Sequence, residues 1–432
     1  MPRPSSIVVD IGFGDGGKGA VVDSLARKRR VDWVVRFNGG AQAAHNVVAP
    51  DGTHHCFHQF GSALLASPST KTFLSKDVLF DPFMARKEEE ELAKLKIRTK
   101  LCVSPDALVV TPWHVSMNQI RETARSDSRH GSCGMGIGET RQDSLLGKPA
   151  VRVRDLLGPD LRAKLQEVFA QKLEDMREFL QESDIPDPSP MAKILLDPSQ
   201  HRTVLENVLS IYTACIRDGV FECADEEILR GKEIVFEGAQ GILLDERVGF
   251  LPYVTWTDTT PHNALEILKS LGMDGEVVGV TRAFGVRHGA GPFPAEDSST
   301  RKWALHTEHN ARGPWQGTFR TGWFDFPLAR HALLASSLDK LVITCIDRLE
   351  RASQIKAIQG YAEGEAFLVP PERGLPSCQV ENVQMEITKR LQNVEPVVRE
   401  YRSPEELVSD IREKLGVKEG WDSHSPSSRI RK

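Results

Sequence analysis

The stretch IGFGDGGKGAVVD, Ile11 to Asp23, is the point from which the fold of this sequence can be worked out. It follows an apolar run, Ile7 to Ile11, that has the composition of a buried parallel strand. Helical character begins at Lys18 and continues to Arg29. A strand, a glycine-rich loop and a helix in this order are the usual setting of a P-loop, so we expect a P-loop-like phosphate loop directly after the first strand.

The spacing of the glycines and the lysine supports that expectation. Gly12, Gly17 and Lys18 fit the P-loop pattern, in which backbone N–H groups and a lysine hold phosphates at a helix N-terminus. Gly19 stands where a Ser or Thr would normally hold Mg²⁺, so the metal needs another ligand. Asp15 can supply it, because a carboxylate about 4 Å from a phosphate charge would otherwise cost on the order of 4 kcal/mol. The alternative is a glycine-rich turn with a solvated aspartate.

The other apolar runs of strand length predict an α/β fold. They are followed by polar, glycine-bearing loops and read DWVVRF (32–37), EIVFEG (233–238), EVVGVTRAF (276–284) and KLVITCID (340–347). Helical patterns lie between them, with two long helices expected over 160–183 and 202–216. This alternation favours a central, mostly parallel β-sheet flanked by helices.

We expect a single domain over residues 1–432. The proline-rich stretch DIPDPSP suggests a surface connector over 185–199, and the composition of WDSHSPSSRIRK suggests a tail over 419–432. Before that tail, SPEELVSDIREKLG predicts a helix with Ser403 as its N-cap and Pro404 at its first position.

Composition and charge exclude several classes of protein. The 432 residues are 40% hydrophobic and can bury a large core, and 55 basic and 60 acidic residues are mixed along the chain to a net charge of −5. No basic field points to nucleic acid, and no apolar run has the length of a membrane span. The first residues lack the pattern of a signal peptide, and the seven cysteines form no CxxC pair. We therefore expect a cytoplasmic protein whose partners are small molecules.

Seven stretches together resemble the adenylosuccinate synthetase family. GDGGKG is similar to the family's first signature, and the others follow in the family's order: VVRFNGGAQAAHNVV, HQFGSALL, FEGAQGILLDERVGFLPYVT, GVRHGAGPFPAE, RTGWFDFPLAR and ITCIDRL. Enzymes of that family use GTP to join aspartate to C6 of inosine monophosphate. The resemblance implies a ligase in purine biosynthesis that takes a purine nucleoside monophosphate, GTP (or ATP) and an amino acid as amine donor, uses Mg²⁺ and forms a homodimer.

The resemblance also implies a division of catalytic roles. Asp15 would remove the proton from N1 of the purine and hold Mg²⁺, with the backbone carbonyl of Ala44 as a second metal ligand. His45 and Lys18 would stabilise the phosphoryl group during transfer, and Gln240 would act at the purine base. The 6-oxo group would then attack the γ-phosphate, and the amine would displace phosphate from C6.

Binding residues are carried over from the family in the same way. For the triphosphate they are Gly14, Asp15, Gly16, Gly17, Lys18, Gly19, Asn46 and Asp347, the last as the carboxylate that recognises guanine. For the substrate nucleotide they are Gln42, Ser132, Cys133, Gln240 and Thr255. For the amine donor they are Arg320 and Arg312, with Arg287 as a further candidate.

The sequence departs from the family in the loop before TGW. Gly317 and Phe319 stand where the family has two arginines that bind the amine donor, the ribose and GTP, and only Lys148 is a candidate for the arginine that crosses between subunits. A deoxy substrate such as dGMP, or a different amine donor, is therefore an alternative. A nucleotide-binding or regulatory protein without catalysis is the alternative of another class.

Overall fold

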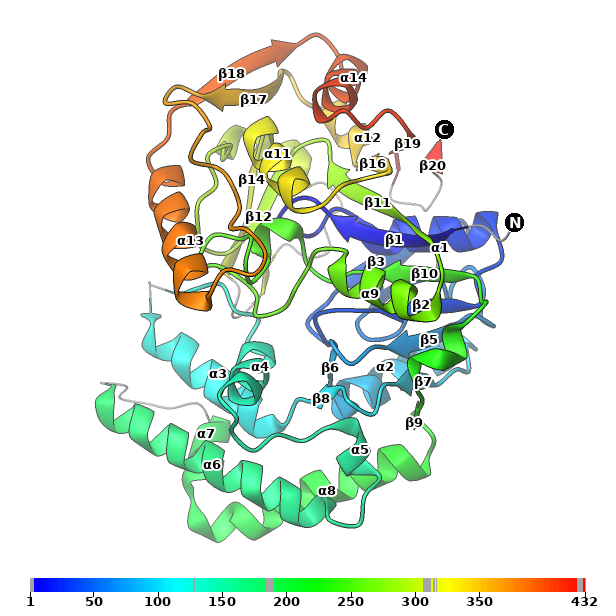
Figure 1. Cartoon of the computed structure of the whole chain (residues 1–432), viewed down its shortest axis with the longest axis vertical. Coiled ribbons are helices and arrows are strands. Elements are labelled where there is room, and N and C mark those ends of the chain that lie inside the picture. Colours follow the sequence, from blue (N-terminus) through cyan, green and yellow to red (C-terminus); the bar gives the residue numbers. More distant parts are fainter. Residues whose placement is uncertain are drawn as a thin grey trace.

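The computed structural model describes residues 4–126, 129–183, 190–305, 312–313, 315, 317–425 and 430–431. In this part of the chain, ten strands form the central sheet (Figure 1). Their spatial order is β20 (Ile430–Arg431), β19 (Gly420–Ser423), β16 (Lys340–Thr344), β11 (Gly275–Arg282), β1 (Ser5–Asp10), β10 (Ile234–Glu237), β2 (Trp33–Arg36), β5 (Lys71–Leu74), β7 (Leu101–Val103) and β9 (Phe221–Cys223). The pairs are parallel except β19 with β20, so the expected mostly parallel sheet is confirmed.

Both faces of the sheet are covered, which explains why its central strands are apolar along their whole length. Successive residues of β1 point to opposite faces. Val8 belongs to the apolar cluster under α1 (Lys18–Lys28), whereas Ile7 and Val9 belong to the cluster that includes α9 (His262–Leu271). All three side chains are at most 1% exposed, and burial of such a side chain contributes about 1.5–3 kcal/mol.

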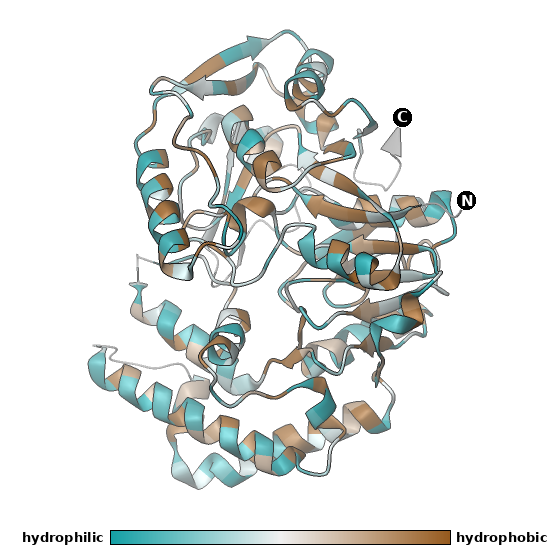
Figure 2. Ribbon diagram, in the orientation of Figure 1, coloured by the Kyte–Doolittle hydropathy of each residue, from teal (hydrophilic) through white to brown (hydrophobic). Residues whose placement is uncertain are grey.

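Helices form a layer below the sheet in the view of Figure 1. They are α2 (Pro82–Lys94), α3 (Pro112–Ala124), α4 (Ile137–Leu145), α5 (Val153–Leu156), α6 (Leu161–Glu182), α7 (Pro190–Leu196) and α8 (His201–Arg217). The two long helices predicted from the sequence are thus α6 and α8. Figure 2 shows the central strands mostly brown, whereas these helices alternate teal and brown along their length. None of the helices in the described ranges is long and apolar enough to cross a bilayer.

A third group of elements lies above the sheet in the same view. It contains α11 (Phe326–Ala335), α13 (Ser377–Leu391), α14 (Pro404–Leu415) and a small sheet of β15 (Phe324–Asp325), β17 (Ile355–Tyr361) and β18 (Pro396–Tyr401). The N-cap predicted for α14 is present, because the Ser403 hydroxyl accepts a hydrogen bond from the backbone N–H of Glu406 at 3.3 Å.

Shorter elements connect these layers. They are β3 (His45–Val48) with β4 (His54–Phe57), β6 (Leu79–Phe80) with β8 (Leu108–Val109), β12 (Gly285–His288), β13 (Arg312–Gly313), β14 (Gly317–Gly322), α10 (Arg301–Ala304), α12 (Ile346–Leu349), and the 3₁₀ turns η2 (Pro198–Gln200), η3 (Glu226–Leu229), η4 (Ile242–Leu244) and η5 (Ser298–Thr300).

The connector expected over 185–199 is only partly described, and the described part is helical. Residues 184–189 lie outside the described residues, but Pro190–Leu196 forms α7, and Ala192 and Leu195 are fully buried against the helical layer. Pro190 and Pro198 occupy the first positions of their helical segments, where the missing N–H of proline costs nothing. The expected surface connector is therefore wrong from residue 190 onward.

The tail expected over 419–432 is also wrong in its first part. Gly420–Ser423 forms β19, which pairs with β16 in the register Leu341 to Gly420. Arg412 holds β19 in place, because its guanidinium donates hydrogen bonds to the carbonyl of Trp421 and to the carboxylate of Asp422. Backbone pairing at the sheet edge thus orders a segment whose side-chain composition resembles that of a tail.

A buried ionic network joins the helices of the lower layer. The Lys172 ammonium on α6 lies 2.6 Å from Asp143 on α4 and 2.5 Å from Asp175 on its own helix. His114 of α3 contacts Asp143 at 3.3 Å, and Lys148 contacts Asp175 at 2.8 Å. Lys172 is 1% exposed, so its loss would leave buried carboxylates without their central cation.

Replacement of Lys172 by alanine should therefore destabilise the protein strongly. We expect Lys172→Ala to lower the free energy of unfolding by about 3–5 kcal/mol, which is typical of removing one partner from a buried ion pair. Urea denaturation monitored by circular dichroism would measure it. The matched control, Lys164→Ala, removes an exposed lysine 3.7 Å from Glu167 and should cost less than about 1 kcal/mol. Equal effects of the two substitutions would contradict this account of the network.

Candidate active site

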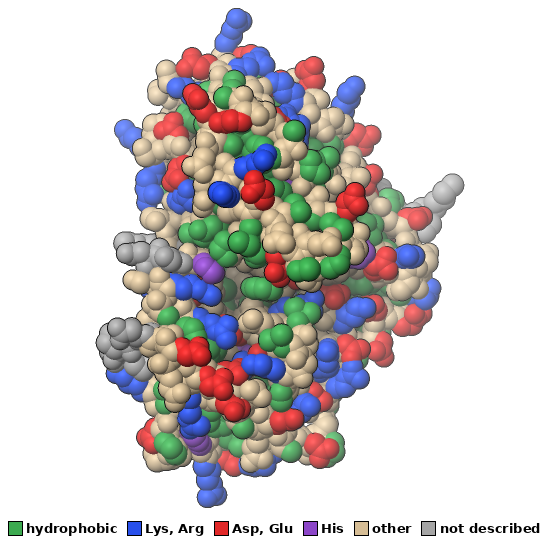
Figure 3. Space-filling model, turned by 60° about the vertical axis from the view of Figure 1, so that its left-hand side comes forward, with side chains coloured by type: hydrophobic (Ala, Val, Ile, Leu, Met, Phe, Trp, Pro, Cys, Tyr) green, Lys and Arg blue, Asp and Glu red, His purple; other side chains and the backbone are tan. Residues whose placement is uncertain are grey.

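A cavity of about 590 Å³ opens at the carboxyl edge of the central sheet. Its walls come from the loop after β1, the segment between β2 and β3, the turn after β10, the end of β11 and the start of α12, with α3 and α4 on the opposite side. Figure 3 shows the surface hollowed across the middle of the molecule. Loops that follow neighbouring parallel strands meet at one edge, which is where ligands bind in open α/β sheets.

The glycine loop is held from beneath by Asp10, the last residue of β1. Asp10 is 2% exposed, and its carboxylate accepts hydrogen bonds from the backbone N–H of Gly12 at 2.8 Å and of Gly16 at 2.7 Å. Sequence reasoning missed this residue. The available signal was an acidic residue at the end of an otherwise apolar strand, where a buried carboxylate needs donors nearby.

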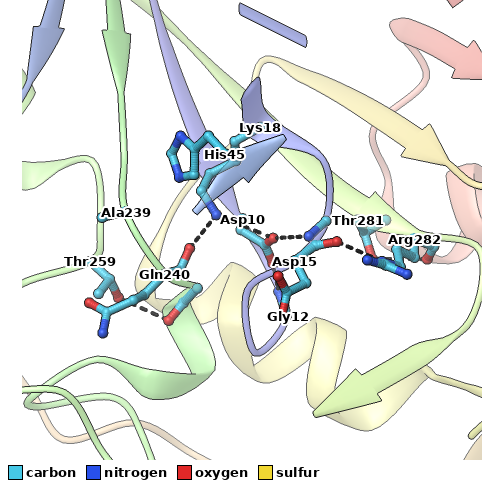
Figure 4. Close-up of polar contacts among 12 residues, drawn as sticks. Asp10, Gly12, Asp15, Lys18, His45, Ala239, Gln240, Thr259, Thr281 and Arg282 are labelled. Carbon is cyan, nitrogen blue, oxygen red and sulfur yellow. Dashed lines mark hydrogen bonds and ion pairs between the residues drawn. The ribbon is translucent and has the colours of Figure 1, made fainter. Parts of the chain in front are cut away.

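Lys18 links the loop to the turn after β10. Its ammonium donates to the backbone carbonyl of Gln240 at 2.6 Å (Figure 4). Gln240 has a φ of 62°, an uncommon conformation for a residue with a side chain. The next residue, Gly241, lies so close to the loop that a Cβ there would be 2.2 Å from the carbonyl oxygen of Gly12. The loop and the turn therefore form one packed unit.

The Asp15 side chain lines the cavity and is 22% exposed. Arg282, at the end of β11, donates to the backbone carbonyl of Asp15 at 2.6 Å. His288 of β12 lies with Nε2 3.7 Å from the carboxylate. In Figure 4 the loop that carries Asp15 lies between Lys18 and Gln240 on the left and Arg282 on the right. Asp15 is thus held at the cavity by contacts from two other strands, one to its backbone and one to its carboxylate.

His45 is held by a buried carboxylate that the sequence analysis did not identify. The Nδ1 atom of His45 lies 2.5 Å from Glu237, the last residue of β10, and the Ser62 hydroxyl donates to the same carboxylate at 2.5 Å. Burial raises the pKa of Glu237, but the neighbouring His45, Arg36 and Ser62 outweigh it and lower that pKa to about 2. Burial, assisted by Arg36, lowers the pKa of His45 to about 4 despite Glu237. At neutral pH the pair is therefore a carboxylate that accepts Nδ1–H from a neutral imidazole, which leaves Nε2 for a ligand.

Two amide side chains at the cavity have buried polar atoms with no partner among the described residues. They are both amide atoms of Gln42 and the Oε1 atom of Gln240. The two side chains flank Gly39, where a Cβ would lie 3.2 Å from Gln42 and 3.8 Å from Gln240. Buried amides without partners are costly, so this pair indicates a polar ligand that supplies the missing hydrogen bonds.

Most of the other residues expected at the site line the same cavity. They are Gly14, Gly17, Gly19, Ala44, Asn46, Ser132, Cys133, Thr255 and Asp347. Ser132 donates to the side chain of Asn118 at 2.9 Å, and burial raises the pKa of the Cys133 thiol to about 11. Ser423 and Ser425 also line the cavity, although the sequence analysis assigned them to a tail.

Three expected residues are placed differently, and the side chain of a fourth is not described. Gly16 donates its N–H to Asp10. Arg320 pairs with Glu296 and donates to the carbonyls of Gly289 and Gly291, and it does not line the cavity. Lys148 is engaged with Asp175, and the side chain of Arg312 lies outside the described part of the structure. Arg287 does line the cavity: it stacks 4.1 Å from the centre of the Phe13 ring.

Comparison with protein families gives one match over nearly the whole chain. The model for adenylosuccinate synthetase matches residues 7–428. The chain is 30% identical to the adenylosuccinate synthetase of Saccharophagus degradans over 381 residues, which are 87% of this chain and 83% of that protein. It is 32% identical to that of Teredinibacter turnerae over 375 residues, or 84% of this chain and 82% of the relative.

Solved structures share the fold. Fully ligated adenylosuccinate synthetase from Plasmodium falciparum superimposes with a TM-score of 0.77 at 20% identity, and 100% of each chain is covered. A cyanophage S-2L succinoaminodeoxyadenylate synthetase bound to dGMP and dATP gives a TM-score of 0.53 at 15% identity, with 99% of this chain and 94% of the other covered.

Substitution of Glu237 by glutamine tests whether the carboxylate orients His45. The neutral amide removes a charge-assisted hydrogen bond that is worth about 1.5–3 kcal/mol. We therefore expect nucleotide-driven turnover of Glu237→Gln to fall about 10- to 100-fold, while the apparent affinity for the triphosphate changes little. Steady-state phosphate release would measure both quantities, with the thermal midpoint as a check on folding. A folded variant with normal turnover would show that His45 does not depend on Glu237.

Proposed function

We propose that this chain, which belongs to the adenylosuccinate synthetase family, uses a nucleoside triphosphate to replace the 6-oxo group of a purine nucleotide with an amine. Enzymes of this family are ligases that form a C–N bond. The observation that carries the proposal is the gathering of Asp15, Lys18, His45 and Gln240 around one cavity. A protein that only bound nucleotides would need the phosphate loop but not the other groups.

The chemistry begins at the 6-oxo group of the purine, which is a poor nucleophile while N1 carries a proton. The Asp15 carboxylate takes that proton, and the oxygen attacks the γ-phosphorus as the nucleoside diphosphate leaves. The amine then adds at C6, and the former 6-oxo oxygen departs with the phosphate. A carboxylate is a weak base for this step, so the contribution of Asp15 depends on being held beside N1.

Lys18 and His45 act on the phosphoryl group. The Lys18 ammonium moves from the Gln240 carbonyl to the transferred phosphate, and the free Nε2 of His45 hydrogen-bonds to it. Both contacts strengthen as negative charge builds up on the phosphate oxygens. Glu237 supports the second contact, because it fixes the His45 ring through Nδ1.

The donor set suits Mg²⁺ held jointly by protein and substrate. Asp15 and the backbone of Ala44 offer hard oxygen ligands at the same cavity, and no cluster of three His, Cys, Asp or Glu side chains that could enclose a metal occurs in the described residues. Mg²⁺ is usually bound by one or two carboxylates plus substrate phosphates rather than by a protein cage. When bound, it neutralises charge on the triphosphate and so removes the repulsion from Asp15.

GTP is the triphosphate that the site supports best. Asp347 at the start of α12 lines the cavity, and its carboxylate can accept two hydrogen bonds from N1 and N2 of guanine, a donor pair that adenine lacks. ATP remains the alternative donor, because Cys345 replaces the lysine that precedes this carboxylate in the family.

L-Aspartate is the proposed amine donor, with Arg287 as the cation for its carboxylates. The Nε and Nη1 atoms of Arg287 donate to the carbonyls of Ala290 and Pro292, which leaves Nη2 for a ligand. No carboxylate of the described residues forms an ion pair with this buried guanidinium, and burial lowers its pKa to about 9. An incoming carboxylate would supply the missing counter-charge.

A 2′-deoxynucleotide such as dGMP is the second candidate substrate. The observation that favours it is the absence of a cation from two positions of β14: Gly317 has no side chain, and Phe319 is fully buried and packs against His288 at 4.6 Å between ring centres. A substrate without a 2′-hydroxyl needs no partner there.

Assays with purified protein would separate these possibilities. We expect phosphate release that requires Mg²⁺, a triphosphate, a 6-oxopurine nucleotide and an amine together, measured with IMP, GMP and their deoxy forms and with a panel of amino acids. Asp15→Ala should lower the rate at least ~10²-fold, as expected for a lost general base, and removal of Mg²⁺ by EDTA should abolish it. Tight nucleotide binding without product under any of these conditions would favour a regulatory protein instead.

We also propose that the protein is a homodimer that associates through the end of α4. Leu145 and Leu146 are 60% and 64% exposed there, next to the loop that carries Lys148. Two adjacent apolar side chains with this exposure, close to the lysine that is the candidate to cross between subunits, support an interface at this end of α4.

The double substitution Leu145→Glu with Leu146→Glu should shift the protein from dimer to monomer. Like charges introduced into an apolar interface are desolvated without partners, which costs several kcal/mol. Light scattering after gel filtration would give the mass of wild type and variant. A wild-type protein that is already monomeric, or a variant that remains dimeric, would contradict this assignment of the interface.

A further inference from the structure

Asp10 is a buried carboxylate that the proposed mechanism does not use. It lies against the glycine loop, and the hydrogen bonds and ion pair of its carboxylate are to the loop itself and to Lys18 (Figure 4). We propose that Asp10 is a positioning residue, which sets the conformation of the phosphate loop and the location of the Lys18 ammonium. The proposal rests on the function proposed above for that loop.

The first argument is the direction of the loop amides. Phosphate loops bind anions through backbone N–H groups that point at the ligand. Here the N–H groups of Gly12 and Gly16 point inward to the two carboxylate oxygens of Asp10, at 2.8 and 2.7 Å. They are therefore not available to a bound phosphate, which must be held by Lys18 and by amides further along the loop. Asp10 thus determines which backbone N–H groups of the loop can point into the cavity.

The second argument is the space around Gly16. A Cβ at this residue would lie 2.4 Å from Oδ2 of Asp10 and 3.0 Å from its Cγ. Gly16 does not have a positive φ, so its backbone would accept another residue. The close approach of the Asp10 carboxylate is what requires glycine there. The Asp10 carboxylate and the missing side chain of Gly16 therefore depend on each other at the base of the loop.

The third argument is the charge of Lys18. Lys18 is 4% exposed, with its ammonium 3.5 Å from Oδ2 of Asp10 and 2.6 Å from the Gln240 carbonyl. A buried ammonium is costly without an opposite charge, and Asp10 is the carboxylate with which it forms an ion pair. Without that carboxylate, the ammonium would lose the counter-charge that keeps it at the base of the loop.

The test compares two buried carboxylates only 13 positions apart. Asp10→Asn keeps the shape of the side chain but replaces one carboxylate oxygen with an NH₂ group. The backbone N–H of Gly12 or of Gly16 then loses its hydrogen-bond acceptor. Asp23→Asn is the matched control, because Asp23 is also fully buried but pairs with Arg27 on α1. Binding of Mg·GTP and Mg·ATP is measured by calorimetry without purine monophosphate or amine, and amide exchange of residues 11–18 is followed in the free protein.

We expect Asp10→Asn to weaken triphosphate binding about 10-fold or more, which corresponds to one lost charge-assisted hydrogen bond, and to speed exchange in the loop. In the full assay its kcat should fall while KM for the purine nucleotide stays near the wild-type value. Asp23→Asn should bind the triphosphate within about threefold of wild type. Equal binding and exchange in the two variants would overturn the proposal. A wild-type protein that binds triphosphate but makes no product would contradict only the proposed ligation, since the contrast between the variants does not depend on turnover.

Gly16→Ala keeps Asp10 and so covers the case in which Asp10→Asn fails to fold, and unchanged triphosphate binding in this variant would overturn the proposal. Gly16→Ala adds one methyl group against the carboxylate, so it should weaken triphosphate binding although Asp10 is intact. In an Asp10→Ala background the methyl group has room, and adding Gly16→Ala should cost little more. Such non-additivity is expected for residues that are in contact or share one hydrogen-bond network, and not for distant, independent positions. Additive losses would show that the two positions act independently and would overturn the proposal.

Discussion

The contact between the loop after β1 and the turn after β10 is the constraint on which the rest of the site depends. A Cβ on Gly241 would lie 2.2 Å from the carbonyl oxygen of Gly12 and 2.4 Å from the backbone nitrogen of Gly14, so only glycine permits this approach. The N–H of Leu243 then donates to the same Gly12 carbonyl at 3.1 Å. Because β1 and β10 are neighbours in the sheet, their carboxyl ends bring Asp15 and Gln240 to one place.

The order of the central strands explains how one cavity collects groups from such distant parts of the chain. In the spatial order β2, β10, β1, β11 and β16, each strand ends at the same edge. β10 contributes Glu237, β1 contributes Asp10, and β11 contributes Arg282, while Asp347 follows β16. Buried acids and bases then stabilise one another: Glu237 is ionised beside His45 and Arg36, and Asp10 forms an ion pair with Lys18. The carboxylates of Glu237 and Asp10 are thus paired before any ligand arrives.

Sequence analysis predicted the parts of this arrangement that local sequence patterns determine. The apolar strands and the N-cap at Ser403 depend on neighbouring residues, and both are found as expected. Glu237 escaped it because its importance comes from groups that the fold brings to it, 192 positions away in the case of His45. Asp10 was missed although its partners Gly12, Gly16 and Lys18 are close in sequence.

The errors have a similar cause. Ser423 was assigned to a tail because its surroundings are polar, yet β19 is held by backbone hydrogen bonds to β16, which need no apolar pattern. Arg320 stays a predicted amine-donor residue, and in this structure Glu296 and two backbone carbonyls engage its guanidinium. Whether a cation is committed to the protein or available to a ligand depends on its neighbours in space, and a single sequence does not contain that information.

The claim that most needs a direct test is that the purine 6-oxo oxygen itself captures the γ-phosphate at the cavity beside Asp15. Labelling this oxygen with ¹⁸O in IMP, GMP and their deoxy forms, followed by mass spectrometry of the released phosphate, would follow its fate. The account predicts one ¹⁸O atom in each phosphate released with the productive nucleotide. Phosphate that carries only unlabelled oxygen would show that water, rather than the purine, attacks the triphosphate, and would contradict the account.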